Sequence, residues 1–308
     1  MNPESSAGGQ WRDHTRSIDP DHEPAENLKG SAVLAGFSCD EGVRRNNGRP
    51  GAKDGPEVIR NALARLAWHH AGEMLDAGDV DCSEEDLETA QEAFGHLISK
   101  LLKAGSFPIG IGGGHEIAFG HYLGIREFIP DAKLGIINFD AHFDMRIPDN
   151  GRGNSGTSFY QIATHAADHG LPFHYLCIGI QKENNSRQLF ETARTYEANW
   201  IEASEVHITE LKILKNRLEH FLETVDHVYV SYCLDVFNAS FAPGVSAVNP
   251  LGLNPDVVLP LTRHLLRSGK VISLDIAELN PHFDIDQRTA RLAAALIYHS
   301  LCEMDWRL

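Results

Sequence analysis

KLGIINFDAHFD, residues 133–144, is the stretch that decides the fold class of this 308-residue chain. Its first half is a short and almost continuously apolar run, which is typical of a strand buried on both faces. Its second half places Asp140, His142 and Asp144 directly after that strand. At a spacing of two residues, these side chains would project from the same side of an extended segment. The stretch therefore predicts a buried strand that delivers polar groups to the edge of a sheet.

Similar apolar runs recur along the chain and alternate with longer amphipathic stretches. We expect strands at residues 32–37, 108–112, 133–140, 174–180, 227–235 and 270–276, with two weaker ones near 74–78 and 199–202. Helical periodicity marks residues 56–68, 84–104, 116–128, 186–196, 207–222, 254–268 and 287–303. This alternation predicts an α/β fold with three layers, in which helices cover both faces of a mostly parallel, eight-stranded sheet.

The domain organisation is expected to be simple. Residues 1–30 are polar and rich in Pro, Asp, Glu and Gly, which predicts a tail or an irregular lead-in. Residues 31–308 contain no internal repeat and no low-complexity linker. We therefore expect one α/β/α catalytic domain over residues 31–308.

Composition and charge exclude several classes of function. With 27 Lys and Arg against 43 Asp and Glu, the formal net charge is −16, which argues against nucleic-acid binding because that needs clustered Lys and Arg. No apolar run approaches the roughly 20 residues that span a bilayer, so we expect no membrane partner. The start lacks the blocks of a secretory signal, and five dispersed cysteines do not suggest a disulfide framework. A cytoplasmic enzyme is the simplest interpretation.

Polar residues follow four of the predicted strands, at the edge where the active sites of parallel sheets lie. They are His115 after the second strong strand, then Asp140, His142 and Asp144, then Cys233 and Asp235, and finally Glu278. A single Asp or His at such a place is more often a helix cap or a hydrogen-bonded structural residue. Several carboxylates converging with imidazoles instead indicate a divalent cation, and this ligand mixture suits Mn(II).

Four segments then resemble, in order and spacing, the signature segments of the arginase/agmatinase/formimidoylglutamase ureohydrolases. They are GGGHE (112–116), NFDAHFD (138–144), S-x-x-x-D (231–235) and SLDIAELNP (273–281). The resemblance runs from about residue 32 to the C-terminus. It implies an arginase-like fold, two Mn(II) ions bridged by a hydroxide, and a homo-oligomer, either a trimer or a hexamer.

The same resemblance implies a role for each matching residue. His115 and Asp144 would bind one ion, and His142 would bind the other. Asp140 would bridge the two ions, and Asp235 would complete the site together with Cys233. Two residues would be catalytic: Asp144 hydrogen-bonds the hydroxide and carries its proton to the leaving amine, and Glu278 pairs with the cationic amidinium of the substrate.

Two departures from the family pattern refine the expected substrate. Cys233 stands where most members have Asp, and Ser155 stands where guanidino hydrolases carry a His. The segments 36–56, 154–159 and 177–185 resemble the formimidoylglutamase branch. The resemblance thus implies hydrolysis of N-formimidoyl-L-glutamate, a small amidine bearing carboxylates, to L-glutamate and formamide, a step in histidine breakdown.

Recognition of those carboxylates can be argued from the residues themselves. Arg146 follows Asp144 by two positions, and a guanidinium is well shaped for bidentate pairing with a carboxylate. Arg44 and Arg45, after the first strong strand, are further candidates. Asn47 and Thr157 are candidate polar contacts. For each arginine the alternative is an ordinary surface salt bridge.

Other functions stay open. The alternatives are hydrolysis of a guanidino acid by another ureohydrolase, and a metal-poor, non-catalytic scaffold of the same fold, which Cys233 and Ser155 would favour. A single-zinc deacylase is less favoured, because zinc alone does not need so many carboxylates. A further hypothesis is a disulfide between Cys39 and Cys233 that would block metal ligation by the thiol.

Overall fold

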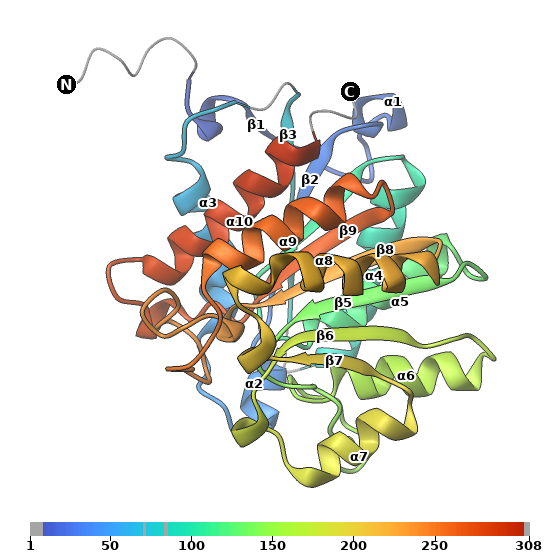
Figure 1. The fold of residues 1–308 in the computed structure, drawn as a ribbon. Coiled ribbons are helices and arrows are strands. Elements are labelled where there is room, and N and C mark those ends of the chain that lie inside the picture. The colour runs from blue at the N-terminus through green and yellow to red at the C-terminus, as the bar shows by residue number, and fades with distance from the viewer. Residues whose placement is uncertain (1–8, 70–71, 83–85, 305–308) are drawn as a thin grey trace.

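The computed structural model describes residues 9–69, 72–82 and 86–304. Within these residues, nine strands form one sheet in which every neighbouring pair is parallel (Figure 1). The strands are β1 (Thr15–Ser17), β2 (Ala32–Ser38), β3 (Met74–Asp81), β4 (Phe107–Ile111), β5 (Leu134–Phe139), β6 (His174–Ile180), β7 (Asn199–Glu202), β8 (His227–Cys233) and β9 (Val271–Ala277). All eight predicted strands are present, so the α/β prediction is confirmed.

The ninth strand lies inside the predicted lead-in. β1 has only three residues, Thr-Arg-Ser, and pairs with the start of β3. So short and polar a segment shows no strand pattern in the sequence, and its pairing is visible only in three dimensions. Residues 1–8 of the lead-in lie outside the described residues.

The α-helices of the described residues lie between the strands and after the last strand. They are α1 (Ala25–Leu28), α2 (Glu41–Arg45), α3 (Gly55–Leu63), α4 (Leu87–Lys103), α5 (Ile117–Phe128), α6 (Ser158–Asp168), α7 (Arg187–Thr195), α8 (Leu211–Glu223), α9 (Pro255–Arg267) and α10 (Arg288–Met304). Each of the seven predicted helical segments contains one, although residues 84 and 85 lie outside the described part of the chain. The short helices α1 and α2 were not predicted, and neither was helix α6. Its buried face is nevertheless helical in spacing, with Phe159, Ile162, Ala163 and Ala166.

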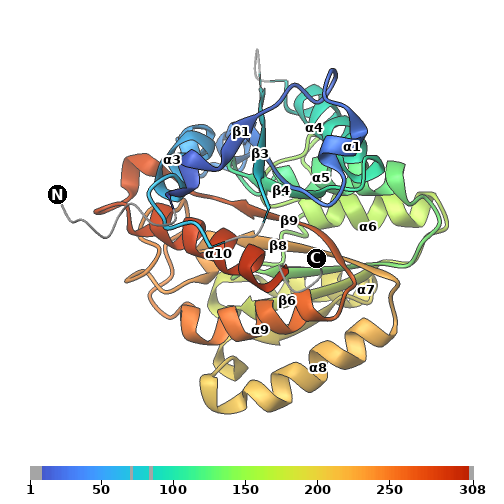
Figure 2. The same ribbon diagram turned by 90° about the horizontal axis from the view of Figure 1, so that it is seen from above.

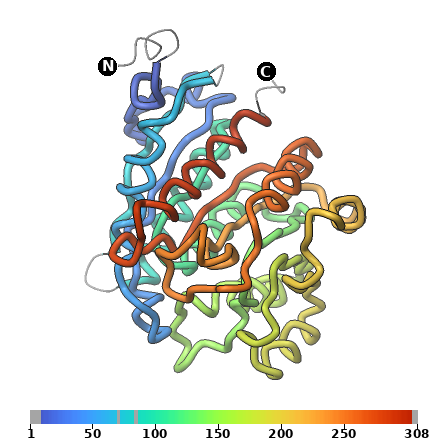
Figure 3. Tube along the Cα trace, turned by 60° about the vertical axis from the view of Figure 1, so that its left-hand side comes forward, coloured from blue at the N-terminus to red at the C-terminus, as the bar shows by residue number. Residues whose placement is uncertain are grey.

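Helices cover both faces of the sheet and give the predicted three layers (Figure 2). Helices α4, α5 and α6 lie on one face, and α8, α9 and α10 lie on the other. The C-terminal helix α10 packs against α3, so the last third of the chain lies beside the first (Figure 3). None of the described helices is long and apolar enough to cross a membrane.

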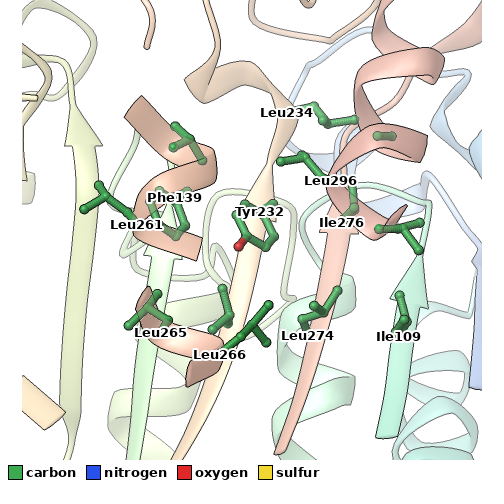
Figure 4. Packing of buried hydrophobic residues seen from close by; sticks show 14 of the residues in the cluster. Ile109, Phe139, Tyr232, Leu234, Leu261, Leu265, Leu266, Leu274, Ile276 and Leu296 are labelled. Atoms are coloured by element: carbon green, nitrogen blue, oxygen red, sulfur yellow. The ribbon is translucent and has the colours of Figure 1, made fainter. Parts of the chain in front are cut away.

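Two hydrophobic clusters, one on each face of the sheet, explain why the strands are continuous apolar runs in the sequence. Along β5, Ile137 and Phe139 belong to the cluster under α9 and α10, whereas Leu134 and Ile136 belong to the cluster under α4 and α5. Figure 4 shows the first cluster, with side chains from α9 and α10 packed onto β5, β8 and β9. Because both faces are buried, alternate side chains point into different cores and almost every position is apolar.

The strand order is β1-β3-β2-β4-β9-β8-β5-β6-β7. The four strands followed by the predicted site residues, β4, β9, β8 and β5, are therefore consecutive neighbours at the middle of the sheet. Their carboxyl ends lie at one edge, where ligands of open α/β sheets bind. Segments far apart in the sequence thus meet at a single place.

Candidate metal centre

The turn after β5 brings Asp140, His142 and Asp144 together, but not in the way that the sequence suggests. Strand β5 ends at Phe139, and the following residues form bends rather than an extended segment. Asp144 has a φ of 47°, in the left-handed region that non-glycine residues rarely adopt. The expected period-two projection is therefore wrong, and the three side chains converge because the backbone turns. Strained residues of this kind are often found at functional sites.

The turn after β4 carries His115. Gly113 has a φ of 65°, and a Cβ atom there would lie 2.7 Å from the carbonyl oxygens of both Phe37 and Cys39. Glycine is therefore required where this loop crosses the end of β2. The close fit places His115 above the neighbouring strands β9 and β8.

Two groups of three side chains are arranged as metal ligands. His115, Asp140 and Cys233 form one, and Asp140, His142 and Asp235 form the other; in each group the candidate ligand atoms all lie within 4.8 Å of one another. Asp140 belongs to both. A shared carboxylate between two triads is the arrangement expected for two adjacent cations with a bridging ligand.

The His115 side of this cluster is completely buried. Nδ1 of His115 lies 2.9 Å from Oδ2 of Asp140 and 2.9 Å from Oδ2 of Asp144. Its Nε2 lies 2.9 Å from Oγ of Ser231, and the hydroxyl of Ser158 donates to its carbonyl oxygen. The imidazole is thus held at both ring nitrogens, with Nδ1 facing the carboxylates.

The His142 side is more open. Nδ1 of His142 lies 3.1 Å from Oδ2 of Asp235 and 3.5 Å from Oδ1 of Asp140. The His142 side chain is 18% exposed and that of Asp144 is 13% exposed, so a small molecule can approach the cluster from this side. Oδ1 of Asp235 is buried without a hydrogen-bond partner.

This donor set fits a pair of divalent cations. Carboxylates and imidazoles suit Mn(II), and a cation would give the unpartnered Asp235 oxygen a ligand role. Cys233 supplies the one soft donor, on the His115 side. Burial, followed by the charges of Asp140 and Asp235, raises the pKa of the Cys233 thiol well above its ordinary value. A coordinated cation would favour the thiolate instead.

The electrostatics of the cluster show how strongly its members interact. Burial disfavours a charged His115, yet hydrogen bonds to Asp140 and Asp144 raise its pKa well above the ordinary value. Burial also disfavours a charged Asp140, but hydrogen bonds from His115 and His142 hold its pKa well below the usual range. For Asp144, burial and the charge of Asp140 raise the pKa to about 6. Such perturbed, mutually facing groups are typical of functional sites.

Glu278 lies next to the buried side of the cluster. Its Oε1 accepts a hydrogen bond of 2.9 Å from the backbone N–H of His115, and its φ of 73° is again left-handed. Burial, then the charges of Glu116 and Asp235, raise the pKa of Glu278 well above its ordinary value. A cationic group entering the site would stabilise the charged carboxylate, as the predicted role requires.

Arg146 lies on the open side, where it hydrogen-bonds an asparagine that the sequence analysis did not select. Nη1 of Arg146 donates to Oδ1 of Asn46 at 2.7 Å, and Nδ2 of Asn46 donates to Oγ of Ser155 at 3.0 Å. Arg146 also lines a cavity of about 420 Å³. The other residues that line it are Met145, Ile147, Asn184, Ser186, Gln188, Leu189 and Thr192.

The other two candidate arginines have carboxylate partners within the protein. Arg45 is 9% exposed, and it bonds to Glu41, to Glu88 and to the carbonyl oxygen of Gly153. It thereby joins α2 to α4 and to the loop after β5. Arg44 makes two hydrogen bonds to Glu41 and is 50% exposed. These contacts match the salt-bridge alternative better than a substrate contact.

The two predicted polar contacts differ from each other. Thr157 is fully buried, and its Oγ1 lies 2.9 Å from the carbonyl oxygen of Asn154 and 2.8 Å from Oε1 of Gln161. It braces the loop before α6 and does not face solvent. Asn47 is exposed, with a φ of 58°, in the turn after α2.

The two cysteines of the disulfide hypothesis have different neighbours. Cys233 groups with His115 and Asp140. The buried Cys39 thiol is instead hydrogen-bonded to Cys82, and burial raises its pKa. Both are free thiols in this structure.

Comparison with known proteins identifies the family. The sequence matches the model of the arginase family over residues 30–302. A formimidoylglutamase of Ralstonia nicotianae is 42% identical over 299 residues, which cover 96% of this chain and 90% of that protein. A formimidoylglutamase of Legionella pneumophila is 44% identical over 266 residues, covering 86% of this chain and 83% of that protein.

Solved structures extend the likeness to three dimensions. The crystal structure of Trypanosoma cruzi formiminoglutamase with Mn²⁺ has a TM-score of 0.83 at 28% identity, covering 97% of this chain and 99% of that one. The formimidoylglutamase of Bacillus subtilis has the same fold, with a TM-score of 0.85 at 23% identity, covering 99% of this chain and 96% of that one. Together with the match over residues 30–302, these likenesses confirm the predicted family: the chain belongs to the arginase family.

Proposed function

We propose that this protein hydrolyses N-formimidoyl-L-glutamate to L-glutamate and formamide, with two Mn(II) ions held between the ends of β4, β5 and β8. The observation that carries the proposal is the sharing of Asp140 by two triads of ligand atoms. The names of the relatives support the substrate, since proteins 42% and 44% identical are formimidoylglutamases. The T. cruzi structure named with Mn²⁺ supports the metal.

The ligands divide between the two positions as the triads do. His115, Cys233 and Asp144 would hold one ion, His142 and Asp235 the other, and Asp140 would contact both. Two divalent ions there supply Lewis acidity and lower the pKa of a bound water, which makes hydroxide available near neutral pH. The fully buried His115 side excludes bulk water from one flank of the reacting centre.

Asp144 is the carboxyl that we assign to proton transfer. Its Oδ2 faces His115, and its partly exposed position lies between the cluster and the open side. In the metal-free site, burial and the charge of Asp140 raise the pKa of Asp144 to about 6; a cation bound there would favour the charged carboxylate, which can accept a hydrogen bond from the attacking water. Asp144 would take the proton of the attacking water and return it to the departing nitrogen.

Glu278 would bind the amidinium of the substrate. Its Oε1 is fixed by the backbone N–H of His115, which aims the carboxylate across the buried side of the cluster. A formimidoyl group is cationic near neutral pH, and pairing it with a preoriented carboxylate positions the carbon for attack.

Arg146 and the cavity beside it would bind the glutamate part. The cavity is lined by Met145 and Arg146, which follow Asp144 in the sequence, and by residues at the start of helix α7; none of the proposed ligands is among its lining residues. Ser186, the N-cap of α7, and Asn184 lie on its wall. An arginine facing a helix N-terminus is a favourable environment for a carboxylate, because both carry positive charge.

The test is turnover of N-formimidoyl-L-glutamate by reduced, Mn(II)-loaded protein, beside arginine, agmatine and guanidinobutyrate. We expect strong selectivity for the formimidoyl compound. Turnover of a guanidino compound alone would overturn the substrate assignment while keeping the metal centre. A protein that binds no Mn(II) and turns over none of the four compounds would overturn the proposal and favour a non-catalytic scaffold.

Two further expectations belong with this function. We propose a cytoplasmic location, because the reaction consumes a metabolite of amino-acid breakdown. We also propose a trimer or hexamer, as the family resemblance implies. Light scattering on the purified protein measures the oligomeric mass, and a monomer would contradict the second expectation.

A further inference from the structure

A chain of polar side chains runs from the metal cluster into the core beneath it. Its members are Ser231 and Tyr229 on β8, Ser273 and Asp275 on β9, and His121 on α5. All five are fully buried. They belong to neither the predicted ligands nor the predicted substrate contacts. Among the described residues, this series of hydrogen-bonded side chains meets the cluster at His115.

The contacts along this chain are short and continuous. His115 Nε2 lies 2.9 Å from Ser231 Oγ, and Ser231 Oγ donates to Asp275 Oδ1 at 2.6 Å. The other carboxylate oxygen, Oδ2, accepts from the Tyr229 hydroxyl and lies 3.0 Å from His121 Nδ1.

The far end is closed as well. His121 Nε2 lies 2.8 Å from Ser273 Oγ, and its ring lies 4.6 Å from that of Tyr229. Room for the pair comes from Gly110, where a Cβ atom would lie 2.8 Å from Cβ of Asp275.

Donor and acceptor rules determine the direction of these bonds. A carboxylate only accepts, so the hydroxyls of Ser231 and Tyr229 must both donate to Asp275. Ser231 has then used its single proton and can only accept from the imidazole. His115 must therefore carry a proton on Nε2, so Nδ1, which faces Asp140 and Asp144, is the nitrogen that can bind a cation once it has lost its own proton.

A buried Asp–His pair is costly to place in a core. Burying polar groups costs free energy even when they are hydrogen-bonded to each other, and an apolar pair of similar volume is frequently no less stable. A contribution to stability therefore does not account for the burial of Asp275 and His121. Orientation of a metal ligand is a function that this pair can perform, because partners of ligating histidines fix both the tautomer and the ring position.

We infer that Asp275, supported by His121 and Tyr229, is a positioning residue that acts through Ser231 to hold His115 as an Nδ1 ligand. This inference rests on the metal-binding part of the proposed function. His142 has no equivalent, since the partners recorded for its ring within the described structure are Asp140 and Asp235. The hydrogen bonds from Asp275 through Ser231 therefore orient a ligand in the buried half of the cluster and not in the open half.

The test compares two tyrosines of the same strand. Tyr229 and Tyr232 are both fully buried on β8, and each uses its hydroxyl in one hydrogen bond. Tyr229 bonds to Asp275, whereas Tyr232 faces the opposite core beside α9 and bonds to Thr262 (Figure 4). Tyr232→Phe is therefore a matched control for Tyr229→Phe, and Asp275→Asn is the stronger probe.

Mn(II) stoichiometry and affinity would be measured by metal analysis and calorimetry. The d–d spectrum of Co(II)-loaded protein reports the ligand geometry independently of turnover. We expect Asp275→Asn to lower the affinity for one of the two Mn(II) ions by roughly ten- to a hundredfold. Tyr229→Phe should lower the affinity for the same ion by roughly two- to tenfold. Tyr232→Phe should leave the affinity for both ions at the wild-type level. Circular dichroism of the metal-free variants checks folding.

Wild-type affinity and an unchanged Co(II) spectrum in folded Asp275→Asn and Tyr229→Phe would overturn the inference. An equal loss of affinity in Tyr232→Phe would also overturn it, because the effect would then follow from core disruption. Failure of the wild-type protein itself to bind Mn(II) would instead overturn the proposed function, and the inference with it.

Discussion

The two histidines of the cluster are held in opposite ways. His115 is fully buried, and the contact of its Nε2 with Ser231 orients the ring from the side away from the carboxylates before any cation binds. His142 is partly exposed, and Asp140 and Asp235 are the partners recorded for its ring. One half of the site is built into the core, and the other half lies at its mouth.

This difference separates two tasks that a binuclear site must combine. A preoriented ligand loses little freedom when a cation binds, which favours tight binding on the His115 side. An accessible ligand leaves room for substrate and water on the His142 side. We therefore expect the ion on the buried side to bind more tightly and to exchange more slowly.

Removing the residue that both halves share should have the largest effect. Asp140→Asn keeps the size of the side chain but removes the charge common to the two triads. Both ions should be lost, and with them about 4 kcal/mol of transition-state stabilisation, which is roughly a thousandfold in kcat/KM. Metal analysis and steady-state kinetics check this. Retention of two ions and full activity would contradict the binuclear assignment.

Glu278→Gln should break the substrate contact of the buried half while keeping the ions. The amide can still accept from the backbone N–H of His115, but it no longer carries charge for the amidinium. Loss of one charge-assisted hydrogen bond should lower kcat/KM by roughly ten- to a hundredfold. Kinetics and metal analysis on the same sample separate the effects. Loss of an ion in this variant would give Glu278 a ligand role instead.

Arg146→Ala should break the substrate contact of the open half, with a smaller effect. We expect KM for N-formimidoyl-L-glutamate to rise by about tenfold, because an accessible ion pair contributes less than a buried one. Turnover of an amidine without carboxylates should stay at its wild-type level, and this substrate is the control. An equal loss for both substrates would mean that Arg146 supports the loop through Asn46 rather than binding carboxylate.

The stability of metal-free protein should fall modestly as pH rises. Burial opposes the charged imidazoles, but neighbouring carboxylates raise the pKa of His115 and His142 well above 6.5. The stability that these groups contribute is present below that value and is lost as pH rises through their folded pKa values. Asp144, raised to about 6, acts in the same direction between about pH 4 and pH 6.

Mn(II) should reverse this trend, since its ligands bind in their deprotonated forms. The increase in Tm on adding Mn(II) should therefore grow by a few degrees between about pH 6 and pH 8. Melting curves with Mn(II) or with a chelator measure it. A Tm of metal-free protein that rises over the same range would contradict the charge assignments in the cluster.

Much of this molecule follows from local sequence. Apolar runs of strand length between amphipathic stretches determine the α/β class, because each strand is buried on both faces and each helix on one. The place of the candidate ligand residues was also predictable. They lie directly after strands, and parallel strands bring their carboxyl ends to one edge whatever the order of the strands.

The hydrogen-bond partners of those residues were decided only by the tertiary structure. Asp275 and His121 are 154 residues apart in the sequence, Ser231 and His115 are 116 apart, and Arg45 meets Gly153 across 108. In the sequence, Asp275 is only a polar residue within a strand, and Arg45 is as plausible a substrate contact as Arg146. Which hydrogen bonds a buried polar group makes depends on strand order and helix packing, and these arise from the whole chain at once. The sequence therefore determined the chemistry available at the site, and the fold decided which of its groups are held still and which stay open to substrate.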